Sequence, residues 1–354
     1  MKVAIIGCGL IGRKRALGLT EEDQLIACCD VNQDSANKFG SEFHCLHFTD
    51  HRDLLKEVPC DIVIVAVVNK YIKEIVIDAL KAGKYVLAEK PLGRNANEAR
   101  EMLSYSLSPP VSKSQSLSVS LSPSFKVSHS PLIKTGFNHR FHPAIWQAKH
   151  RVNEGEIGKI FNIRARYGHG GRQGMEKEWR ASKELCGGGE LLDQGVHIID
   201  LIRWFGGEVR EVFGKVETKF WDMEVEDNAF AIIKTDIDVT ASMHVSWTNW
   251  KNIFSFEVFG TDGYIRIEGL GGSYGPETLE IGKRKKEGGR PDIQTIEFPP
   301  EDVSWKAEWQ EFKNAIIEQR MVIGSGIDGL KANEVIEALY LSQKINAPVF
   351  LGDK

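Results

Sequence analysis

The sequence has no long apolar segment and no block of basic residues. Its longest uninterrupted apolar run extends from Ile62 to Val68, far short of the ~18 residues that a membrane-spanning helix needs. The 45 lysines and arginines are outnumbered by 49 aspartates and glutamates, which gives a net charge of −4. Proteins that bind nucleic acid or anionic membranes carry basic patches. We therefore expect neither a nucleic acid nor a membrane as a partner.

Cysteine is also scarce, and metal-ligand spacings are absent from the sequence. None of the 6 cysteines forms a C-x-x-C pair, and most fall in predicted strands, where a free thiol acts as a small apolar group. His139, His142 and His150 lie close together but lack acidic or cysteine companions at helical or finger spacing, so no metal is predicted. The first predicted strand begins at Lys2 and leaves no room for a signal peptide. We expect a reducing, cytoplasmic compartment.

The first residues predict a strand, a glycine turn and a helix. Residues 2–6 are a short apolar strand, and Gly7, Gly9 and Gly12 follow as G-x-G-x-x-G before a helix from about Leu10. In a dinucleotide-binding turn the first glycine permits the tight bend. The second lets the backbone approach the pyrophosphate, and the third lets helix and strand pack closely. The phosphates would bind at the helix N-terminus.

An acidic residue supports the same interpretation. The strand "QLIACCD" ends at Asp30, where a carboxylate would bind the adenosine ribose hydroxyls and repel a 2′-phosphate. NAD is therefore predicted in preference to NADP. The basic run at residues 13–15 is the feature that would favour the extra phosphate of NADP.

Strands and helices then alternate as far as residue 136, and the strands are apolar throughout. That pattern is typical of a doubly wound parallel sheet covered on both faces. Ligands of such sheets bind beyond the carboxyl ends of the strands. Asn69 and the triplet Glu89-Lys90-Pro91 fall at such ends, which makes Lys90 a catalytic candidate.

One segment departs from the alternation. Residues 106–130 contain serine at 11 of 25 positions, where a short helix-to-strand connection is expected. Loops of this length are uncommon in compact domains. The connection would lie at the amino ends of the strands, so we expect it to have no part in catalysis.

The second half of the chain has a different pattern. Several segments alternate polar and apolar residues between Gly, Asp and Asn, as in "DNAFAIIKTD" and "GYIRIEG". They predict a large, mainly antiparallel sheet with one covered face. Two helices, at about 305–319 and 329–345, close the chain. With 354 residues, we predict two domains: a Rossmann domain at 1–136 and an α+β domain at 137–354.

Within the second domain, "GGGELLDQGVHIIDL" at residues 187–201 predicts a buried helix with a polar stripe. Asp193, His197 and Asp200 lie three or four residues apart and share one helix face, while apolar residues cover most of the circumference. A simple stabilising Asp–His pair on a surface helix would give the same pattern. The stretch alone leaves both interpretations open.

The chain resembles the glucose–fructose oxidoreductase / inositol dehydrogenase (Gfo/Idh/MocA) family at four motifs in the family's order. These are "GCGLIG", "AEKPLG", "GFNHRFHP" and "GGGELLDQGVHIIDLIRWFGG". The resemblance covers the whole chain except residues 106–130. It departs after the fourth strand, where the family's T-P-N-x-x-H is Val67-Val68-Asn69 with Ile72 at the histidine position.

The resemblance implies an NAD-dependent dehydrogenase for a secondary alcohol of a sugar, cyclitol or sugar nucleotide. It implies that Lys90, Asp193 and His197 are catalytic: His197 takes the hydroxyl proton, Lys90 stabilises the oxygen, and Asp193 orients the substrate or assists the proton relay. Asp200 is expected to be structural. The implied cofactor residues are Gly7, Gly9, Leu10, Ile11, Gly12, Asp30, Asn69, Glu89 and Lys90, and the substrate residues are Asn138, Arg140, Trp179 and Arg180.

Two other functions fit the same scaffold. A redox-neutral glycosidase would hold NAD and use it for transient oxidation, without net NADH formation. A ligand sensor would keep the fold and lack the chemistry, but this chain retains the lysine and the Asp/His pair. The family resemblance also implies a homodimer or homotetramer formed through the carboxyl-terminal sheet.

Overall fold

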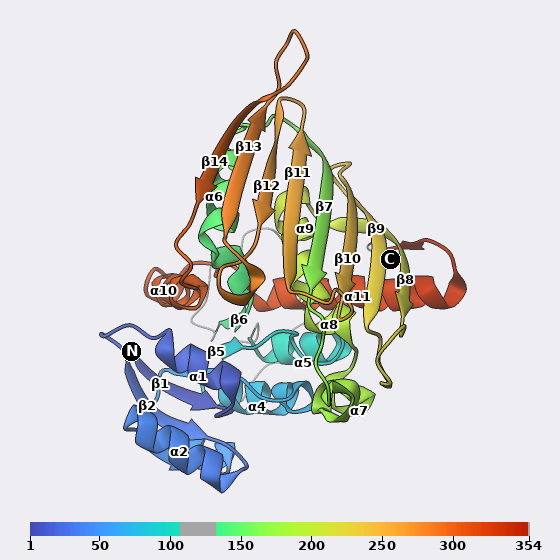
Figure 1. Cartoon of the computed structure of the whole chain (residues 1–354). Helices are drawn as coiled ribbons and strands as arrows, with labels where there is room; N and C mark the ends of the chain where they lie inside the picture. Colours follow the sequence, from blue (N-terminus) through green and yellow to red (C-terminus); the bar gives the residue numbers. More distant parts are fainter. Residues whose placement is uncertain (107–131, 353–354) are drawn as a thin grey trace, which may run out of the picture. The chain divides into compact units, whose positions relative to one another are not determined.

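A parallel sheet of six strands forms from the first part of the chain (Figure 1). The computed structural model describes residues 1–106 and 132–352. The strand order is β3-β2-β1-β4-β5-β6, with every pair parallel. The strands are β1 (Lys2–Ile6), β2 (Gln24–Cys29), β3 (Leu46–Phe48), β4 (Ile62–Val65), β5 (Tyr85–Ala88) and β6 (Ile133–Thr135). The predicted doubly wound sheet is confirmed.

Helices alternate with these strands and cover both faces of the sheet. They are α1 (Leu10–Leu17), α2 (Gln33–Phe43), α3 (His51–Glu57), α4 (Asn69–Lys81) and α5 (Ala96–Ser106). Along β1, Val3 and Ile5 belong to one buried cluster, whereas Ala4 and Ile6 belong to another. Side chains alternate across a strand, so the all-apolar strand is explained by burial on both sides. Strands β2 and β3 lie on one side of β1, and strands β4 to β6 lie on the other side. Ligands of such sheets bind at this switch point between β1 and β4.

The chain divides into two compact units, and their limits differ from a simple cut at residue 136. Unit 1 comprises residues 1–93, 97–136 and 309–330, and unit 2 comprises residues 94–96, 137–308 and 331–354. Helix α10 (Ser304–Ile317) contributes Trp309 and Phe312 to the unit 1 core beside Val3 and Ile5. A segment from the carboxyl-terminal part thus completes the parallel-sheet unit. Residues 107–130 of the serine-rich segment lie outside the described residues.

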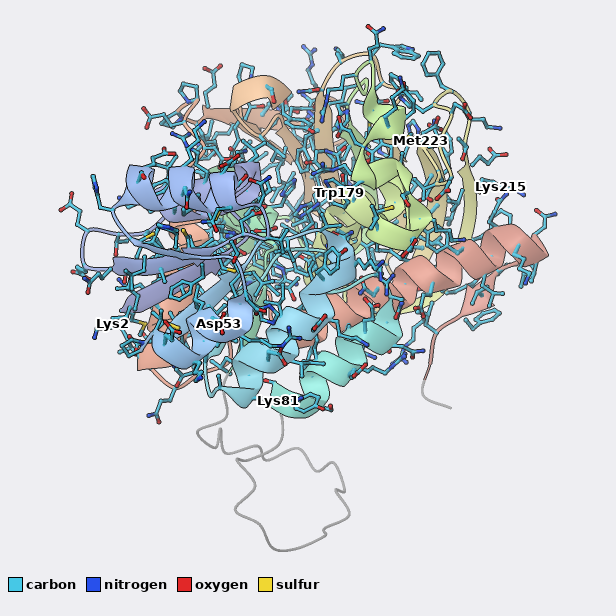
Figure 2. The ribbon with its side chains drawn as sticks, turned by 90° about the horizontal axis from the view of Figure 1, so that it is seen from below. Lys2, Asp53, Lys81, Trp179, Lys215 and Met223 are labelled. Atoms are coloured by element: carbon cyan, nitrogen blue, oxygen red, sulfur yellow. The ribbon has the colours of Figure 1, made fainter. Side chains whose placement is uncertain are left out.

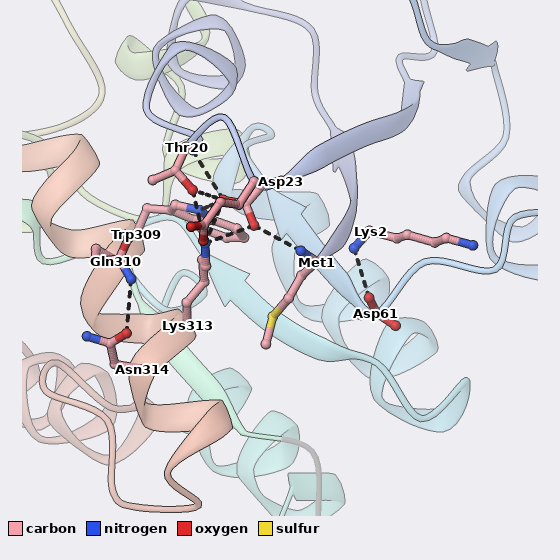
Figure 3. A network of polar contacts seen from close by, with 10 residues as sticks. Met1, Lys2, Thr20, Asp23, Asp61, Trp309, Gln310, Lys313 and Asn314 are labelled. Atoms are coloured by element: carbon pink, nitrogen blue, oxygen red, sulfur yellow. Dashed lines mark hydrogen bonds and ion pairs between the residues drawn. The ribbon is translucent and has the colours of Figure 1, made fainter.

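A buried carboxylate ties α10 to the turn before β2 (Figure 3). Asp23 accepts hydrogen bonds from Thr20 Oγ1 at 2.7 Å, Trp309 Nε1 at 2.6 Å and Lys313 Nζ at 3.2 Å. The amine of Met1 lies 3.0 Å from Asp23 Oδ1. Burial alone would raise the pKa of Asp23, but these donors lower it below the ordinary range. The carboxylate therefore stabilises the folded unit as long as it stays ionised.

Asp23→Asn should lower the free energy of unfolding at neutral pH by about 2 kcal/mol. The folded-state pKa is below the unfolded value of about 3.9, so wild type should lose this stability as the pH falls below about 4. The variant should lack that part of the acid slope. Urea unfolding between pH 3 and 7 measures the free energy of unfolding and its pH dependence. Glu21→Gln on the same turn is the control. An unchanged slope in Asp23→Asn would contradict the assignment.

Unit 2 is built on a nine-stranded sheet in the order β14-β13-β12-β11-β7-β10-β9-β8-β15. All neighbours are antiparallel except β7 and β10, which are parallel. The strands are β7 (Ile160–Gly168), β8 (Val209–Glu217), β9 (Asn228–Thr235), β10 (Thr240–Ser246), β11 (Ile253–Gly260), β12 (Gly263–Glu268), β13 (Thr278–Lys283), β14 (Asp292–Glu297) and β15 (Val349–Phe350). The mainly antiparallel second sheet is confirmed.

One face of this sheet is covered by helices, and among the described residues the other face is open. Helices α6 (Pro143–Asn153) and α9 (Gly195–Gly206) and the residues of α11 (Gly326–Ile345) from 331 onward share one core with the strands (Figure 1). On β9, Phe230 and Ile232 point to the other face and are about half exposed. The polar/apolar alternation in the sequence reflects this one-sided burial. In the described residues no helix is long and apolar enough to cross a membrane.

Candidate active site

The glycine turn between β1 and α1 has the geometry that a dinucleotide loop requires. Gly7 has a φ of +102°, and a Cβ there would lie 2.1 Å from the Ala66 carbonyl oxygen. A Cβ at Gly12 would lie 1.9 Å from the Gly7 carbonyl oxygen. A Cβ at Gly9, in contrast, would meet no atom within 4 Å. Gly7 and Gly12 are thus needed for the fold, while Gly9 leaves open space beside the start of α1.

The predicted ribose ligand, Asp30, follows β2 beside this loop. Its Oδ2 accepts a hydrogen bond from the backbone N–H of Cys8 at 2.9 Å, and its Oδ1 accepts one from that of Asn32 at 2.9 Å. The carboxylate therefore anchors the glycine loop. Each carboxylate oxygen has a second acceptor position, so the anchor leaves capacity for a ribose hydroxyl.

The basic run on α1 is engaged within unit 1. Arg15 is buried, and its Nε donates to Glu89 Oε1 at 2.6 Å. Arg13 Nη2 lies 2.6 Å from Glu42 Oε1 at the surface. Both arginines thus have carboxylate partners, and the predicted cofactor residue Glu89 is held by one of them. Because Arg13 and Arg15 already pair with carboxylates, they are less suited to bind a 2′-phosphate.

The remaining predicted residues of unit 1 follow β4 and β5. Asn69 is buried and begins α4, and Lys90 is half-buried and directly precedes Pro91. Ile72, at the family's histidine position, is fully buried in the core with Val76. At this position the chain therefore has an apolar residue that serves core packing. Leu10 is exposed at the start of α1 and Ile11 is half-buried.

The stretch at 187–201 does not form the single helix that its spacing predicts after the three glycines. The structure has two helices, α8 (Glu190–Asp193) and α9 (Gly195–Gly206), with a break at Gln194. The N–H of His197 donates to the Gln194 carbonyl at 3.0 Å. A Cβ at Gly195 would lie 3.1 Å from both Leu191 and Val245 side chains. Close packing at this glycine accompanies the break, so Asp193 ends one helix and His197 lies in the first turn of the next.

The structure gives Asp193 and His197 different surroundings. Asp193 is about one-fifth exposed, and its Oδ2 lies 3.5 Å from Arg180 Nε. The Arg180 guanidinium lies 4.4 Å from the centroid of the Trp179 ring. His197 is nearly fully buried. Three of the predicted residues, Trp179, Arg180 and Asp193, therefore form one contiguous set.

Trp179 is held by a small apolar cluster on the same unit. Together with Trp221 and Met223 it packs against the buried residues Met175, Cys186, Val225 and Trp247; Figure 2 labels Trp179 and Met223. Short 3-10 turns at Met175–Lys177 and Trp179–Ala181 lead into this position. The cluster fixes the ring on which Arg180 lies.

The other two predicted substrate residues are buried in internal polar contacts. Arg140 Nε and Nη2 donate to the two oxygens of Asp200 at 2.7 and 2.6 Å. Asn138 Nδ2 donates to Ser304 Oγ at 2.9 Å. Asp200 is therefore the structural partner that was expected, and we propose a structural role for Arg140 as well.

Two groups near Asp193, Tyr274 and His169, were not predicted from the sequence. Burial raises the pKa of Tyr274 to about 12, and the nearby carboxylates Glu190 and Asp193 raise it too. Tyr274 Oη accepts a hydrogen bond from Gln194 Nε2 at 2.8 Å. Burial lowers the pKa of His169, against the opposing effect of Asp193. Neither residue belongs to a motif, so no spacing rule identifies them.

The sequence predicts no role for His139, yet its ring contacts that of His197. The ring centroids are 3.7 Å apart and the planes differ by 17°. Both residues are nearly fully buried. In the described residues, no group of three or more His, Cys, Asp or Glu side chains is placed to hold a metal ion.

Comparison with known proteins identifies two matching family models. Residues 1–107 match "Oxidoreductase family, NAD-binding Rossmann fold", and residues 145–266 match "GFO/IDH/MocA C-terminal domain". Levoglucosan dehydrogenase of Pseudarthrobacter phenanthrenivorans is 23% identical over 75% of this chain and 73% of its own. D-glucoside 3-dehydrogenase of Escherichia coli is 28% identical over 66% of each chain. A solved structure of levoglucosan dehydrogenase in complex with NADH superposes with a TM-score of 0.86 at 22% identity, covering 100% of both chains.

Proposed function

Because the chain belongs to the Gfo/Idh/MocA oxidoreductase family, we propose that it oxidises a secondary alcohol of a sugar, cyclitol or sugar nucleotide with NAD. The carbinol C–H bond breaks as a hydride that reduces the nicotinamide, and the hydroxyl proton goes to a base on the protein. The product is the ketone and NADH, and the reverse reaction reduces the ketone. The observation that carries the proposal is the match of residues 1–107 to the NAD-binding oxidoreductase family. In unit 2, the Arg180–Asp193 contact and the buried His197 supply groups that can bind a substrate and take a proton.

The proposed roles follow from the chemistry of each side chain. His197 accepts the hydroxyl proton, since a neutral imidazole has one ring nitrogen that can take a proton. Lys90, as the family resemblance implies, donates a hydrogen bond to the same oxygen and stabilises negative charge on it. Asp193, oriented by Arg180, binds substrate hydroxyls or passes the proton onward. Bound NAD supplies the hydride acceptor.

A sugar-like substrate is supported by the groups beside Asp193. Trp179, Arg180 and Asp193 offer an aromatic face, a donor and an acceptor in one contiguous set. Polyhydroxylated ligands need several oriented polar groups beside an apolar surface. Three of the relatives are named for levoglucosan, D-glucosides and inositols, which have this chemistry.

The preference for NAD over NADP is argued from Asp30 and the two engaged arginines. Asp30 lies at the end of β2 and anchors the glycine loop, where its charge would repel a 2′-phosphate. Arg13 and Arg15 already have carboxylate partners. We therefore expect a lower KM for NAD than for NADP.

The test of the function is NADH absorbance on mixing the protein and NAD with a panel of sugars, inositols and nucleotide sugars. Turnover with at least one polyol, faster with NAD than with NADP, is the expected result. Sugar release from a glycoside without any NADH would instead assign the redox-neutral glycosidase chemistry. NAD binding without turnover on the whole panel would favour a sensor.

Gly9→Ala and Gly12→Ala should separate cofactor binding from folding. Because a Cβ at Gly9 meets no atom, the free energy of unfolding of Gly9→Ala should lie within about 1 kcal/mol of the wild-type value. The variant should bind NAD about tenfold more weakly, because its methyl group lies where the backbone approaches the pyrophosphate. Gly12→Ala places its Cβ against the Gly7 carbonyl and should lose stability. Calorimetric NAD titration and thermal unfolding measure the two effects. Unchanged NAD affinity in Gly9→Ala would argue against this binding mode.

We also propose that the chain forms a homodimer or homotetramer through the open face of the unit 2 sheet. A groove of about 670 Å³ crosses that face and is lined by Arg166, Phe230, Ile232 and His244 among others. Phe230 and His244 stack at 4.0 Å. Exposed apolar surface bordered by charged groups is typical of protein–protein contacts.

Ile232→Glu should convert the oligomer to monomers, because it places a carboxylate beside the exposed Phe230 on that face. Ile237→Glu is the matched control, since Ile237 is equally exposed but lies in the turn between β9 and β10. Light scattering after size exclusion gives the mass. A wild-type monomer, or an oligomer that persists in Ile232→Glu, would contradict the proposed interface.

A further inference from the structure

His139 and His197 form a buried pair of stacked imidazole rings. Their centroids lie 3.7 Å apart with an angle of 17° between the planes. His139 comes from the 3-10 turn Asn138–Phe141, and His197 from the first turn of α9. The rings of Phe137 and Tyr167 meet His197 edge-on at 6.0 and 6.4 Å. Aromatic neighbours thus set the plane of the His197 ring, with His139 covering one face.

A directional chain of hydrogen bonds fixes the other ring of the pair. Ser304 Oγ donates to Asp302 Oδ1 at 2.5 Å, and Asn138 Nδ2 donates to Ser304 Oγ at 2.9 Å. Asn138 therefore presents its Oδ1 to His139, whose Nδ1 lies 3.2 Å away. An amide oxygen only accepts, so Nδ1 of His139 is the protonated nitrogen. The ring orientation and tautomer of His139 follow from Asp302 through two intervening side chains.

We propose that His139 is a positioning residue for His197: it holds the imidazole by face-to-face stacking, and the chain from Asp302 holds His139. This inference rests on the proposed function, in which His197 is the base. A general base acts only when its nitrogen meets the hydroxyl proton in a fixed direction, and a misplacement of about 1 Å costs up to about 100-fold in rate. A stacked ring, anchored at its own far edge, supplies that constraint without touching the substrate.

The surroundings explain why the constraint is needed. The helix break at Gln194 leaves His197 in the first turn of α9, where the backbone lacks the full helical hydrogen-bond pattern. The ring of His142 also meets His139 edge-on at 5.6 Å, and His142 Nδ1 lies 3.0 Å from Glu277 Oε2. His139 therefore contacts both the His197 ring and a second anchored histidine.

The test compares His139→Ala with His139→Phe in the NADH assay. His139→Ala removes the stacking face and should lower kcat about 10- to 100-fold, with the KM for NAD and polyol within about twofold of wild type. His139→Phe keeps a flat ring and should recover most of the loss. Ser304→Ala breaks the chain without altering either ring, and should lower kcat a few-fold. If the His139 variants do not fold, Ser304→Ala alone tests the positioning role through kcat.

Proton NMR of the His197 ring supplies a readout independent of activity. The stacked ring should shift the His197 ring protons upfield in wild type and in His139→Phe, and this shift should disappear in His139→Ala. Unchanged kcat in His139→Ala, or equal losses in the Ala and Phe variants, would overturn the positioning role. If no polyol is oxidised, the proposed function is contradicted but the positioning role is not. The ring-proton shifts then decide whether His139 holds the His197 ring.

Discussion

His197→Asn should lower kcat by about 10²- to 10⁴-fold, the usual contribution of a positioned general base. The expected loss has a simple cause: without the imidazole, the hydroxyl proton has no acceptor as the hydride leaves the carbinol. NAD affinity should stay within about twofold, because the glycine loop and Asp30 lie in the other compact unit. Steady-state NADH formation and calorimetric NAD titration measure the two quantities.

His150→Asn is the matched control for this variant. His150 is exposed on α6 and lies 3.2 Å from Glu154 in a surface i,i+4 pair, which contributes little to stability. Its activity should equal that of wild type. Equal activity of His197→Asn and His150→Asn would show that another group takes the proton.

Arg140→Met should reduce the free energy of unfolding by about 3–5 kcal/mol, because it leaves the buried Asp200 carboxylate without its bidentate partner. The pair is buried on both sides, with N–O distances of 2.6 and 2.7 Å. The double variant Arg140→Met/Asp200→Leu should regain part of the loss, since no uncompensated charge remains. Urea unfolding measures the changes.

The control for Arg140 is Arg52→Met. Arg52 is exposed on α3 and pairs with Glu74 and Asp78 of α4 at the surface of unit 1, and its removal should cost less than about 1 kcal/mol. Normal stability in Arg140→Met together with a raised polyol KM would restore the substrate role that the sequence predicted for Arg140.

The fold was predictable wherever one local pattern determined it. The apolar strand at Lys2–Ile6 and the glycines after it specify a strand–turn–helix, and the structure shows that Gly7 and Gly12 have no room for a side chain. The alternation along β9 correctly indicated a sheet with one covered face. Such features depend on residues close in sequence, and their physical rules are short-ranged.

What the sequence did not predict depends on contacts between distant segments. The break at Gln194 accompanies close packing of Gly195 against Val245 on β10, which no helical periodicity reveals. Trp309 packs in the core of the first sheet and donates a hydrogen bond to Asp23, which lies 286 residues earlier in the chain. The stack of His139 on His197 depends on ring orientations, which spacing does not specify. The catalytic, cofactor and substrate residues themselves stay predictions until the variants are measured.

The most direct test of the central claim uses a polyol that is active in the NADH assay, deuterated at the carbinol carbon that is oxidised. Hydride transfer predicts one deuterium in each NADH formed, one ketone for each NADH, and a slower reaction than with the undeuterated polyol. Mass spectrometry of the recovered cofactor gives the label. Deuterium retained in the product, with NAD unchanged at the end of the reaction, would contradict the dehydrogenase.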